Sequence, residues 1–212
     1  MGIKGEGKMN TNDSQIIDLF EKEVAKYAGS KYGVAVSSGT NGIFLSLELL
    51  KLNNELPKII SIPYRTYMSV PMSILNTGSK IKFRDEKWSG SYRLEPTNVW
   101  DSAVRFTKDM YVKDSLYVLS FQYRKGIPMG RGGMILTDSK KYYDLLKKLR
   151  FNGRTDGISQ VDDIYNIKGW NMYMTPEQAA RGLTLMSVLP DKNKDTAGYQ
   201  DYPDISNHPV FK

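Results

Sequence analysis

The sequence of 212 residues contains no cysteine and a single histidine. The lack of cysteine excludes disulfide bonds, cysteine-ligated metal sites and catalysis by a thiol. One histidine cannot anchor a typical zinc site when no cysteine is present. We therefore predict no metal centre, and we interpret His208 as a structural or solvent-exposed side chain.

Long apolar runs are also missing from the sequence. No stretch approaches the roughly 20 apolar residues that a membrane-spanning helix needs. Residues 1–12 lack the apolar segment of a secretion signal, and we interpret them as a disordered lead. These absences predict a cytoplasmic protein without membrane contact.

Positive charge exceeds negative charge, with 30 Lys and Arg against 23 Asp and Glu and a formal net charge of +7. This balance suits an anionic ligand such as a phosphate, a sugar nucleotide or a nucleic acid. The basic residues are spread along the chain, and no zinc-finger, helix-turn-helix or RNA-binding aromatic signature accompanies them. We predict that nucleic acid is not a partner. An α/β domain that binds anions or nucleic acid through charge alone is kept as an alternative.

Strand-like runs alternate with amphipathic helical patterns through most of the chain. Helices are expected over residues 12–28, after the turn at 37–42, from Thr66 to about Asn76, over 139–149 and from Pro176 onward. Strands are expected at residues 32–36, 58–62, 80–83, 97–101, 116–119 and 134–136, and residues 84–96 are interpreted as a loop. The alternation predicts a three-layer α/β/α domain with a mainly parallel sheet.

A lysine is placed on a turn between two of these strands. Lys125 follows the run 116–119, and the glycines Gly130, Gly132 and Gly133 precede the run 134–136. Glycine permits backbone conformations and close approaches that a β-carbon forbids, so the layout predicts a lysine in a fixed position. A lysine amine attacks a carbonyl compound only when neutral, and burial lowers its pKa toward that form. The ordinary alternative is a surface lysine.

Two further positions suit a ligand site. The turn Ser37-Ser38-Gly39-Thr40-Asn41-Gly42 leads from a strand into a helix, where free amides and the positive end of the helix dipole attract anions. Ser, Thr and Gly are equally ordinary N-cap residues. Asp101 ends the strand 97–101, and an acid at that end of a strand in an α/β sheet lies on the ligand side.

Together these motifs resemble the DegT/DnrJ family of sugar aminotransferases, which use pyridoxal 5'-phosphate. The spacing of Ser120 and Lys125, followed by Gly130-Arg131-Gly132-Gly133, carries the likeness. It continues in Leu149-Arg150-Phe151-Asn152-Gly153-Arg154-Thr155 and in Gly169-Trp170-Asn171-Met172-Tyr173-Met174. The resemblance covers roughly residues 14–188. It implies the large domain of a fold-type-I aminotransferase.

The resemblance assigns a role to each matching position. It implies that Lys125 carries the aldehyde of the cofactor and that Asp101 pairs with the ring nitrogen, which makes the ring an electron sink. It places Tyr67, otherwise a plausible core aromatic, against the face of the ring. The residues implied around the phosphate are Ser120, Gly39, Thr40 and Asn41. It also implies a homodimer in which Asn171 reaches the phosphate of the other subunit's cofactor.

The sequence departs from the family pattern at three places. Val104 stands where the family has Gln or His, and Tyr173 stands where it usually has Arg. Residues 13–189 are expected to form a cofactor-binding domain, and residues 190–212 form an irregular tail where family members continue into a smaller C-terminal domain. On this interpretation the chain is truncated relative to the family.

The resemblance implies a pyridoxal-phosphate-dependent aminotransferase that transfers an amino group from an amino-acid donor to a keto sugar nucleotide. Such enzymes serve cell-surface polysaccharide biosynthesis. Lys125 argues against the dehydratase branch of the family, which lacks this lysine. The alternative is a cofactor-binding or partner-binding homologue that does not turn over because the C-terminal domain is missing.

Overall fold

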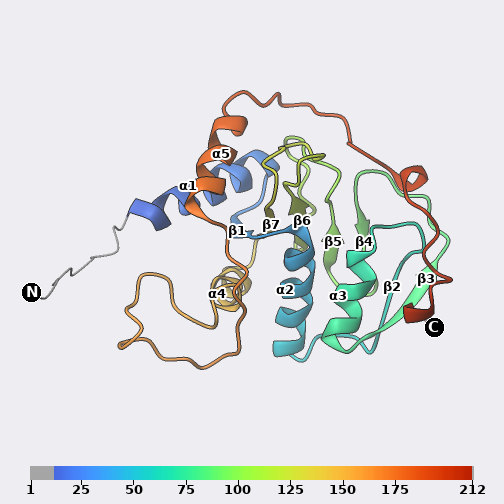
Figure 1. The fold of residues 1–212 in the computed structure, drawn as a ribbon, viewed down its shortest axis with the longest axis horizontal. Helices are drawn as coiled ribbons and strands as arrows, with labels where there is room; N and C mark the ends of the chain where they lie inside the picture. Colours follow the sequence, from blue (N-terminus) through green and yellow to red (C-terminus); the bar gives the residue numbers. More distant parts are fainter. Residues whose placement is uncertain (1–11, 212) are drawn as a thin grey trace, which may run out of the picture.

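The computed structural model describes residues 12–211, in which helices and strands alternate as far as residue 84 and four further strands then follow one another before the last two α-helices (Figure 1). The helices are α1 (Asn12–Ala28), α2 (Gly39–Leu52), α3 (Ser69–Thr77), α4 (Lys140–Leu149) and α5 (Pro176–Met186). The strands are β1 (Tyr32–Val36), β2 (Ile59–Pro63), β3 (Lys80–Arg84), β4 (Tyr92–Arg93), β5 (Val99–Asp101), β6 (Leu116–Ser120) and β7 (Gly133–Thr137). The predicted lead, residues 1–12, lies outside the described residues except for Asn12, which begins α1.

The strands form a five-stranded sheet in the order β1-β7-β6-β5-β4 and a two-stranded sheet of β2 and β3. β1 and β6 both run antiparallel to β7, and β5 runs parallel to β6, so β1, β5 and β6 share one direction. Ser61 of β2 pairs antiparallel with Glu95, shortly after β4, which itself opposes β5. β2 and its parallel partner β3 therefore run with β5. The predicted mainly parallel sheet is confirmed, with β4 and β7 as its antiparallel members.

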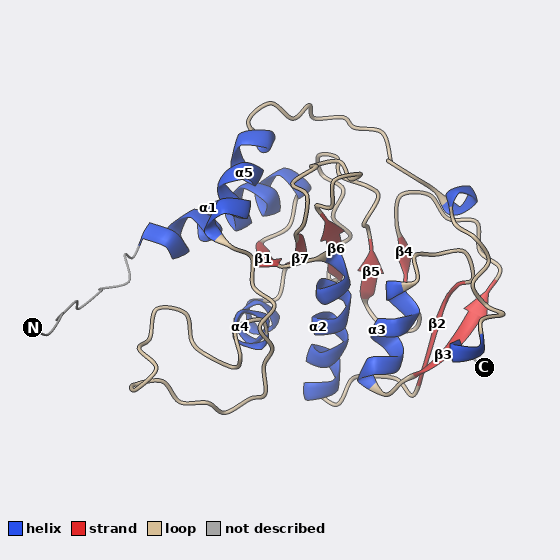
Figure 2. Ribbon diagram, viewed as in Figure 1, coloured by secondary structure: helices blue, strands red, loops and turns tan. Residues whose placement is uncertain are grey.

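Side chains of the central strands alternate between two apolar cores because successive residues of a strand point to opposite faces. Val34, Val118 and Ile135 pack in the core that also contains buried residues of α2, α3 and α4. Ala35 and Met134 point the other way, into the core shared with α1 and α5. Figure 2 shows α2 and α3 side by side along one face of the sheet. The predicted three-layer arrangement is thus confirmed.

Two local expectations were wrong. The helix predicted from Thr66 begins at Ser69, so Tyr67 lies in the turn before α3. Thr66 is buried and hydrogen-bonds the hydroxyl of Tyr92. This contact holds the turn before α3 against β4. The predicted loop 84–96 contains β4, in which Tyr92 pairs with Asp101.

A buried ion pair joins the two outer layers. The side chains of Glu21 on α1 and Arg150 after α4 are each 4% exposed and hydrogen-bonded to one another. Both also bond the backbone of Ala35 in β1, whose amide donates to Glu21 Oε1 at 2.8 Å. Lys147 lies 3.1 Å from Glu21 and 3.0 Å from Asp156, which extends the cluster. The cluster fixes α1, β1 and α4 relative to one another.

We expect Glu21→Gln to lower the free energy of unfolding by about 3–5 kcal/mol, because it leaves the charge of Arg150 buried without its partner. The oxygen of the glutamine side chain can still accept the hydrogen bond from the Ala35 amide. The decrease in the free energy of unfolding therefore reports the loss of the negative charge. The control is Asp144→Asn, which breaks the exposed Lys140–Asp144 pair on α4 and should change nothing measurable. Urea unfolding followed by circular dichroism measures both, and equal effects would contradict the assignment.

Candidate active site

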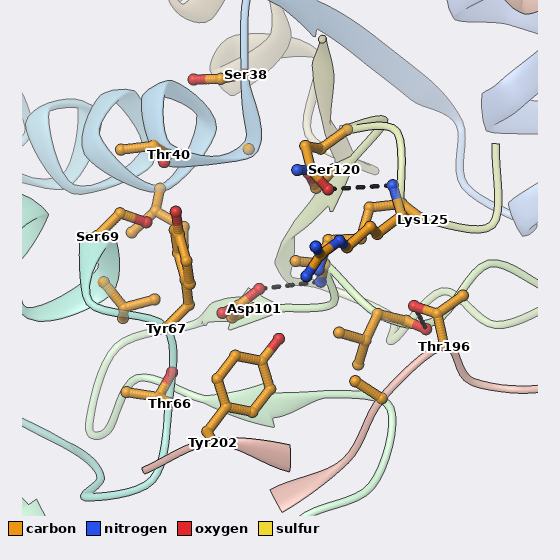
Figure 3. Close-up of a pocket in the computed structure, with 18 of the residues that line it drawn as sticks. Ser38, Thr40, Thr66, Tyr67, Ser69, Asp101, Ser120, Lys125, Thr196 and Tyr202 are labelled. Carbon is orange, nitrogen blue, oxygen red and sulfur yellow. Dashed lines mark hydrogen bonds between the residues drawn. The ribbon is translucent and has the colours of Figure 1, made fainter. Parts of the chain in front are cut away.

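A cavity of about 590 Å³ lies where β5 and β6 end and α2 begins. Most of the predicted site residues line it, namely Gly39, Thr40, Tyr67, Asp101, Ser120 and Lys125. Figure 3 shows Ser120, Lys125 and Asp101 gathered on one side of this space, with Tyr67 facing them. The structure therefore brings together side chains that are far apart in the sequence. Asn41 and Asn171 are not among the lining residues.

The start of α2 lies at one end of the cavity. Ser38 caps the helix by accepting the Asn41 amide at 3.1 Å, and the preceding amides of Gly39 and Thr40 have no acceptor within the helix. A Cβ at residue 39 would lie 3.0 Å from Ser120 Cβ, so glycine lets the helix begin directly against the end of β6. The side chain of Asn41 donates to Ser37 Oγ at 2.7 Å and shapes this turn.

Asp101 is a buried acid, 6% exposed, at the end of β5. Its Oδ2 accepts from the Tyr92 hydroxyl at 2.7 Å, and its Oδ1 accepts from the Ala103 amide at 2.9 Å. Burial raises the pKa of the Asp101 carboxyl, while these two hydrogen bonds and the charge of Lys125 oppose the rise. A positively charged ligand group beside Asp101 would stabilise the carboxylate further.

Tyr92 and Thr66 orient Asp101, and the sequence analysis missed both. The one proton of the Tyr92 hydroxyl goes to Asp101, so Thr66 donates to Tyr92 in the hydrogen bond that joins them. Burial raises the pKa of Tyr92 well above its ordinary value, which keeps that proton in place. The available signal was the turn Glu95-Pro96-Thr97-Asn98, which follows a β-type run and suggests a hairpin.

Lys125 lies on the connection between β6 and β7. Its amide donates to the carbonyl of Gln122 at 2.9 Å, and the Phe121 amide donates to Gly132 at 2.9 Å, which closes the base of the loop. Gly130 and Gly132 adopt φ values of 94° and 139°, in the region that favours glycine. Burial lowers the pKa of Lys125, and the charge of Asp101 opposes this. The amine is thus biased toward its neutral, nucleophilic form.

Four further positions singled out from the sequence lie at the edge of the cavity or outside it. Tyr67 is 62% exposed at the rim of the cavity. Asn171 is exposed at an isolated bridge to Phe151. Val104 is buried in the core and also borders the cavity. Tyr173 packs edge-on against Phe151.

Further lining residues were not anticipated as ligand contacts. Arg131 belongs to the quoted glycine cluster, and its Nε donates to the Ser37 carbonyl at 3.2 Å beside the start of α2. Four more come from the tail that was expected to be irregular: Thr196, Ala197, Asp201 and Tyr202. Nothing in the local sequence pattern of the tail marks these four.

Within residues 12–211, no group of three or more acidic or imidazole side chains is arranged to hold a metal ion. None of the helices in that range has both the length and the apolar character needed to cross a bilayer.

The fold defines a class of protein, the fold-type-I aminotransferases. The structure of AtS13 from Actinomadura melliaura superposes with a TM-score of 0.73 at 19% identity, covering 82% of this chain and 60% of that one. GDP-4-keto-6-deoxymannose-3-dehydratase (ColD) with bound GDP-perosamine gives a TM-score of 0.69 at 18% identity, covering 84% and 62%.

The chain belongs to the DegT/DnrJ/EryC1/StrS aminotransferase family, whose model matches residues 6–109 and 111–199. The resemblance noted from the sequence is confirmed, and the match runs past residue 188 into the tail. A curated relative, the spore coat polysaccharide biosynthesis protein SpsC of Bacillus subtilis, is 25% identical over 228 aligned residues. The alignment covers 84% of this chain and 58% of SpsC, so the chain spans about three fifths of that relative's length.

The charge of Asp101 is expected to control the reactivity of Lys125. Because Asp101 raises the pKa of Lys125 against the effect of burial, Asp101→Asn should lower that pKa further and move the labelling curve to lower pH. Trace acetylation at a series of pH values, with mass spectrometry of the peptide containing Lys125, measures the shift. The control is Asp201→Asn, which removes a carboxylate lining the same cavity and should leave the curve in place. A curve that does not move in Asp101→Asn would refute the coupling.

Proposed function

We propose that this protein is a pyridoxal-phosphate-dependent aminotransferase that acts on a keto sugar nucleotide with an amino-acid donor. The observation that carries the proposal is the meeting of Lys125, Asp101 and the start of α2 in one cavity of a chain from this family. The similarity to SpsC, a spore coat polysaccharide biosynthesis protein, supports a place in cell-surface polysaccharide biosynthesis. The absence of cysteine fits a reducing cytoplasm, which we propose as its location.

The chemical groups that line the cavity match three parts of this cofactor: its phosphate, its ring nitrogen and its aldehyde. The amides of Gly39 and Thr40 with the hydroxyl of Ser120 suit a phosphate. The buried carboxylate of Asp101 suits a protonated ring nitrogen, and the amine of Lys125 suits an aldehyde. Tyr67, at the rim, can cover the face of a ring. When bound, pyridoxal phosphate supplies an electron sink for the carbon that exchanges its amino group.

The chain's own groups perform the remaining steps. Asp101, oriented by Tyr92 and Ala103, holds the positive charge at the ring nitrogen. The neutral Nζ of Lys125 would take a proton from the substrate carbon and deliver it to the cofactor. The start of α2 keeps the phosphate end fixed, so that the reacting carbon stays within reach of Lys125.

The charge around the cavity supports an anionic substrate. Arg124 and Arg131 line it beside Lys125, and such a positive rim suits the diphosphate of a sugar nucleotide. The similar ColD structure is that of a dehydratase with bound GDP-perosamine. Lys125 favours amino transfer over dehydration, because the dehydratase branch lacks this lysine.

A homologue that binds the cofactor without turnover is the second candidate. Val104, where the family has a polar residue, places an apolar side chain at the edge of the cavity, and this favours the second candidate. The two candidates differ on addition of an amino donor. Turnover converts the bound cofactor to its amine form and shifts its visible absorption, whereas a binding protein leaves the spectrum unchanged.

We expect Lys125→Ala to abolish the covalent, borohydride-fixed attachment of pyridoxal phosphate while leaving some non-covalent binding. Asp101→Asn should keep the attachment but slow amino transfer by more than about 100-fold, a loss of roughly 3 kcal/mol of transition-state stabilisation. Absorption spectra and peptide mass spectrometry after borohydride measure both. Lys113→Ala, which changes an exposed lysine outside the cavity, is the control. Attachment at full yield in Lys125→Ala would sink the proposal.

We also propose a homodimer with a shared site. Support comes from the exposed Asn171 and from the apolar side chains that the loop 154–169 presents to solvent, which are Ile158, Val161, Ile164 and Tyr165. Exposed apolar side chains close together on one loop are typical of a surface that another chain covers.

The shared site predicts complementation between two inactive variants. Lys125→Ala and Asn171→Ala, mixed in equal amounts and allowed to exchange subunits, should regain about one quarter of wild-type cofactor attachment at limiting cofactor, because half of the dimers hold one intact site. Attachment no higher than the average of the two separate variants would show that Asn171 does not act across an interface. Light scattering at micromolar concentration measures the dimer directly.

A further inference from the structure

The segment after α5 crosses the cavity. Figure 1 shows it running from α5, along the edge where β5 and β6 end, toward β3. We call residues 195–205 the strap. It contributes four lining residues: Thr196, Ala197, Asp201 and Tyr202.

The first anchor of the strap is a two-pronged ion pair. Arg105 donates from Nε and a terminal nitrogen to the two carboxylate oxygens of Asp195, at 2.9 and 2.8 Å, and Ser89 adds a bond at 3.2 Å. The guanidinium passes over Gly90, where a Cβ would lie 2.2 Å from its central carbon. The adjacent Thr196 amide donates to the Val104 carbonyl at 2.8 Å. This end of the strap is therefore held by a fitted contact.

The second anchor fixes the other end. Arg65 donates to the carbonyl of Tyr202 at 2.9 Å, and its own carbonyl accepts from Trp88 Nε1 at 2.8 Å. Ile205 is 2% exposed, and its amide donates to Tyr64 at 3.1 Å. The two ends of the strap are thus tied to different segments, one that follows β5 and one between β2 and α3.

Between the anchors, Tyr202 presents its hydroxyl to the cavity. Its ring lies 5.6 Å from the ring of Trp88, and Figure 3 shows the hydroxyl directed toward Asp101. Among residues 12–211 no protein group hydrogen-bonds this hydroxyl. Burial, followed by the charges of Asp101 and Asp201, raises the pKa of Tyr202 to about 12. The phenol keeps its proton and can donate it to a ligand oxygen.

We propose that the strap is a wall of the ligand site and that the Tyr202 hydroxyl donates a hydrogen bond to an oxygen of the ligand bound beside Asp101. That oxygen belongs either to the cofactor or to the amino acid joined to it. The proposal rests on the proposed function, because the ligand is taken to be pyridoxal phosphate and its conjugates. It adds a positioning residue from a segment that the sequence pattern left without a role.

The first experiment compares Tyr202→Phe with the wild type, using two probes whose dissociation constants are measured by fluorescence: pyridoxal phosphate and phosphopyridoxyl-L-glutamate. Loss of one hydrogen bond should weaken binding about 3- to 10-fold. Weakening of both probes locates the contact on the cofactor, and weakening of the conjugate alone locates it on the amino acid. Changes below about twofold for both probes overturn the proposal. Tyr32→Phe, at the start of β1 and stacked on Tyr143 outside the cavity, is the matched control.

The second experiment tests the strap itself by hydrogen exchange. Pyridoxal phosphate should slow exchange in the peptide covering 195–205 of the wild type. Asp195→Asn should reduce that protection, whereas Asp191→Asn, which breaks the exposed pair with Lys108 on the same tail, should preserve it. A ligand that binds without slowing exchange in the strap overturns the inference while the proposed function stands. A wild type that binds neither probe refutes the proposed function itself.

Discussion

The burial of one carboxyl group, that of Asp101, governs the arrangement of the ligand side. A charged group removed from water is costly unless hydrogen bonds and opposite charges compensate. The Tyr92 hydroxyl, the Ala103 amide and the charge of Lys125 compensate in part. Burial still dominates, so the pKa of Asp101 is raised in the free protein. A cationic group beside Asp101 would lower this desolvation cost. Binding of a ligand that carries such a group is therefore expected to stabilise the folded protein.

Two ion pairs differ in their burial and in the parts of the molecule that they connect. Glu21 and Arg150 are almost fully buried, where salt scarcely screens them, and they fix the layers of the scaffold. Arg105 and Asp195 are 31% and 22% exposed, so their attraction is weaker and depends on salt. The buried pair therefore connects the layers of the scaffold, and the more exposed, salt-dependent pair holds the strap.

Sequence patterns predicted the features that depend on residues close together in the chain. The α/β class, the strand runs around Lys125 and the capped turn before α2 follow from periodicity and glycine placement, and the structure contains them. Contacts between distant segments were not predictable in this way. Tyr92 meets Asp101 only because β4 pairs with β5, and Tyr202 reaches the cavity only because Arg65 and Arg105 hold the tail. No periodicity or turn signal in the sequence predicts those tertiary contacts. The roles assigned to the site residues stay predictions.

The place of β7 in the sheet has a consequence for how the protein is made. β7 lies between β1 and β6, and β1 pairs with it in register from Tyr32 with Thr137 to Val36 with Gly133. During synthesis, β1 and the turn after it must wait about 100 residues for their neighbour, at roughly 5–20 residues per second. The hairpin that carries Lys125 forms as soon as β7 leaves the ribosome, since its strands are adjacent in sequence. The strap emerges later still, so the loop that carries Lys125 can form before residues 195–205 are available.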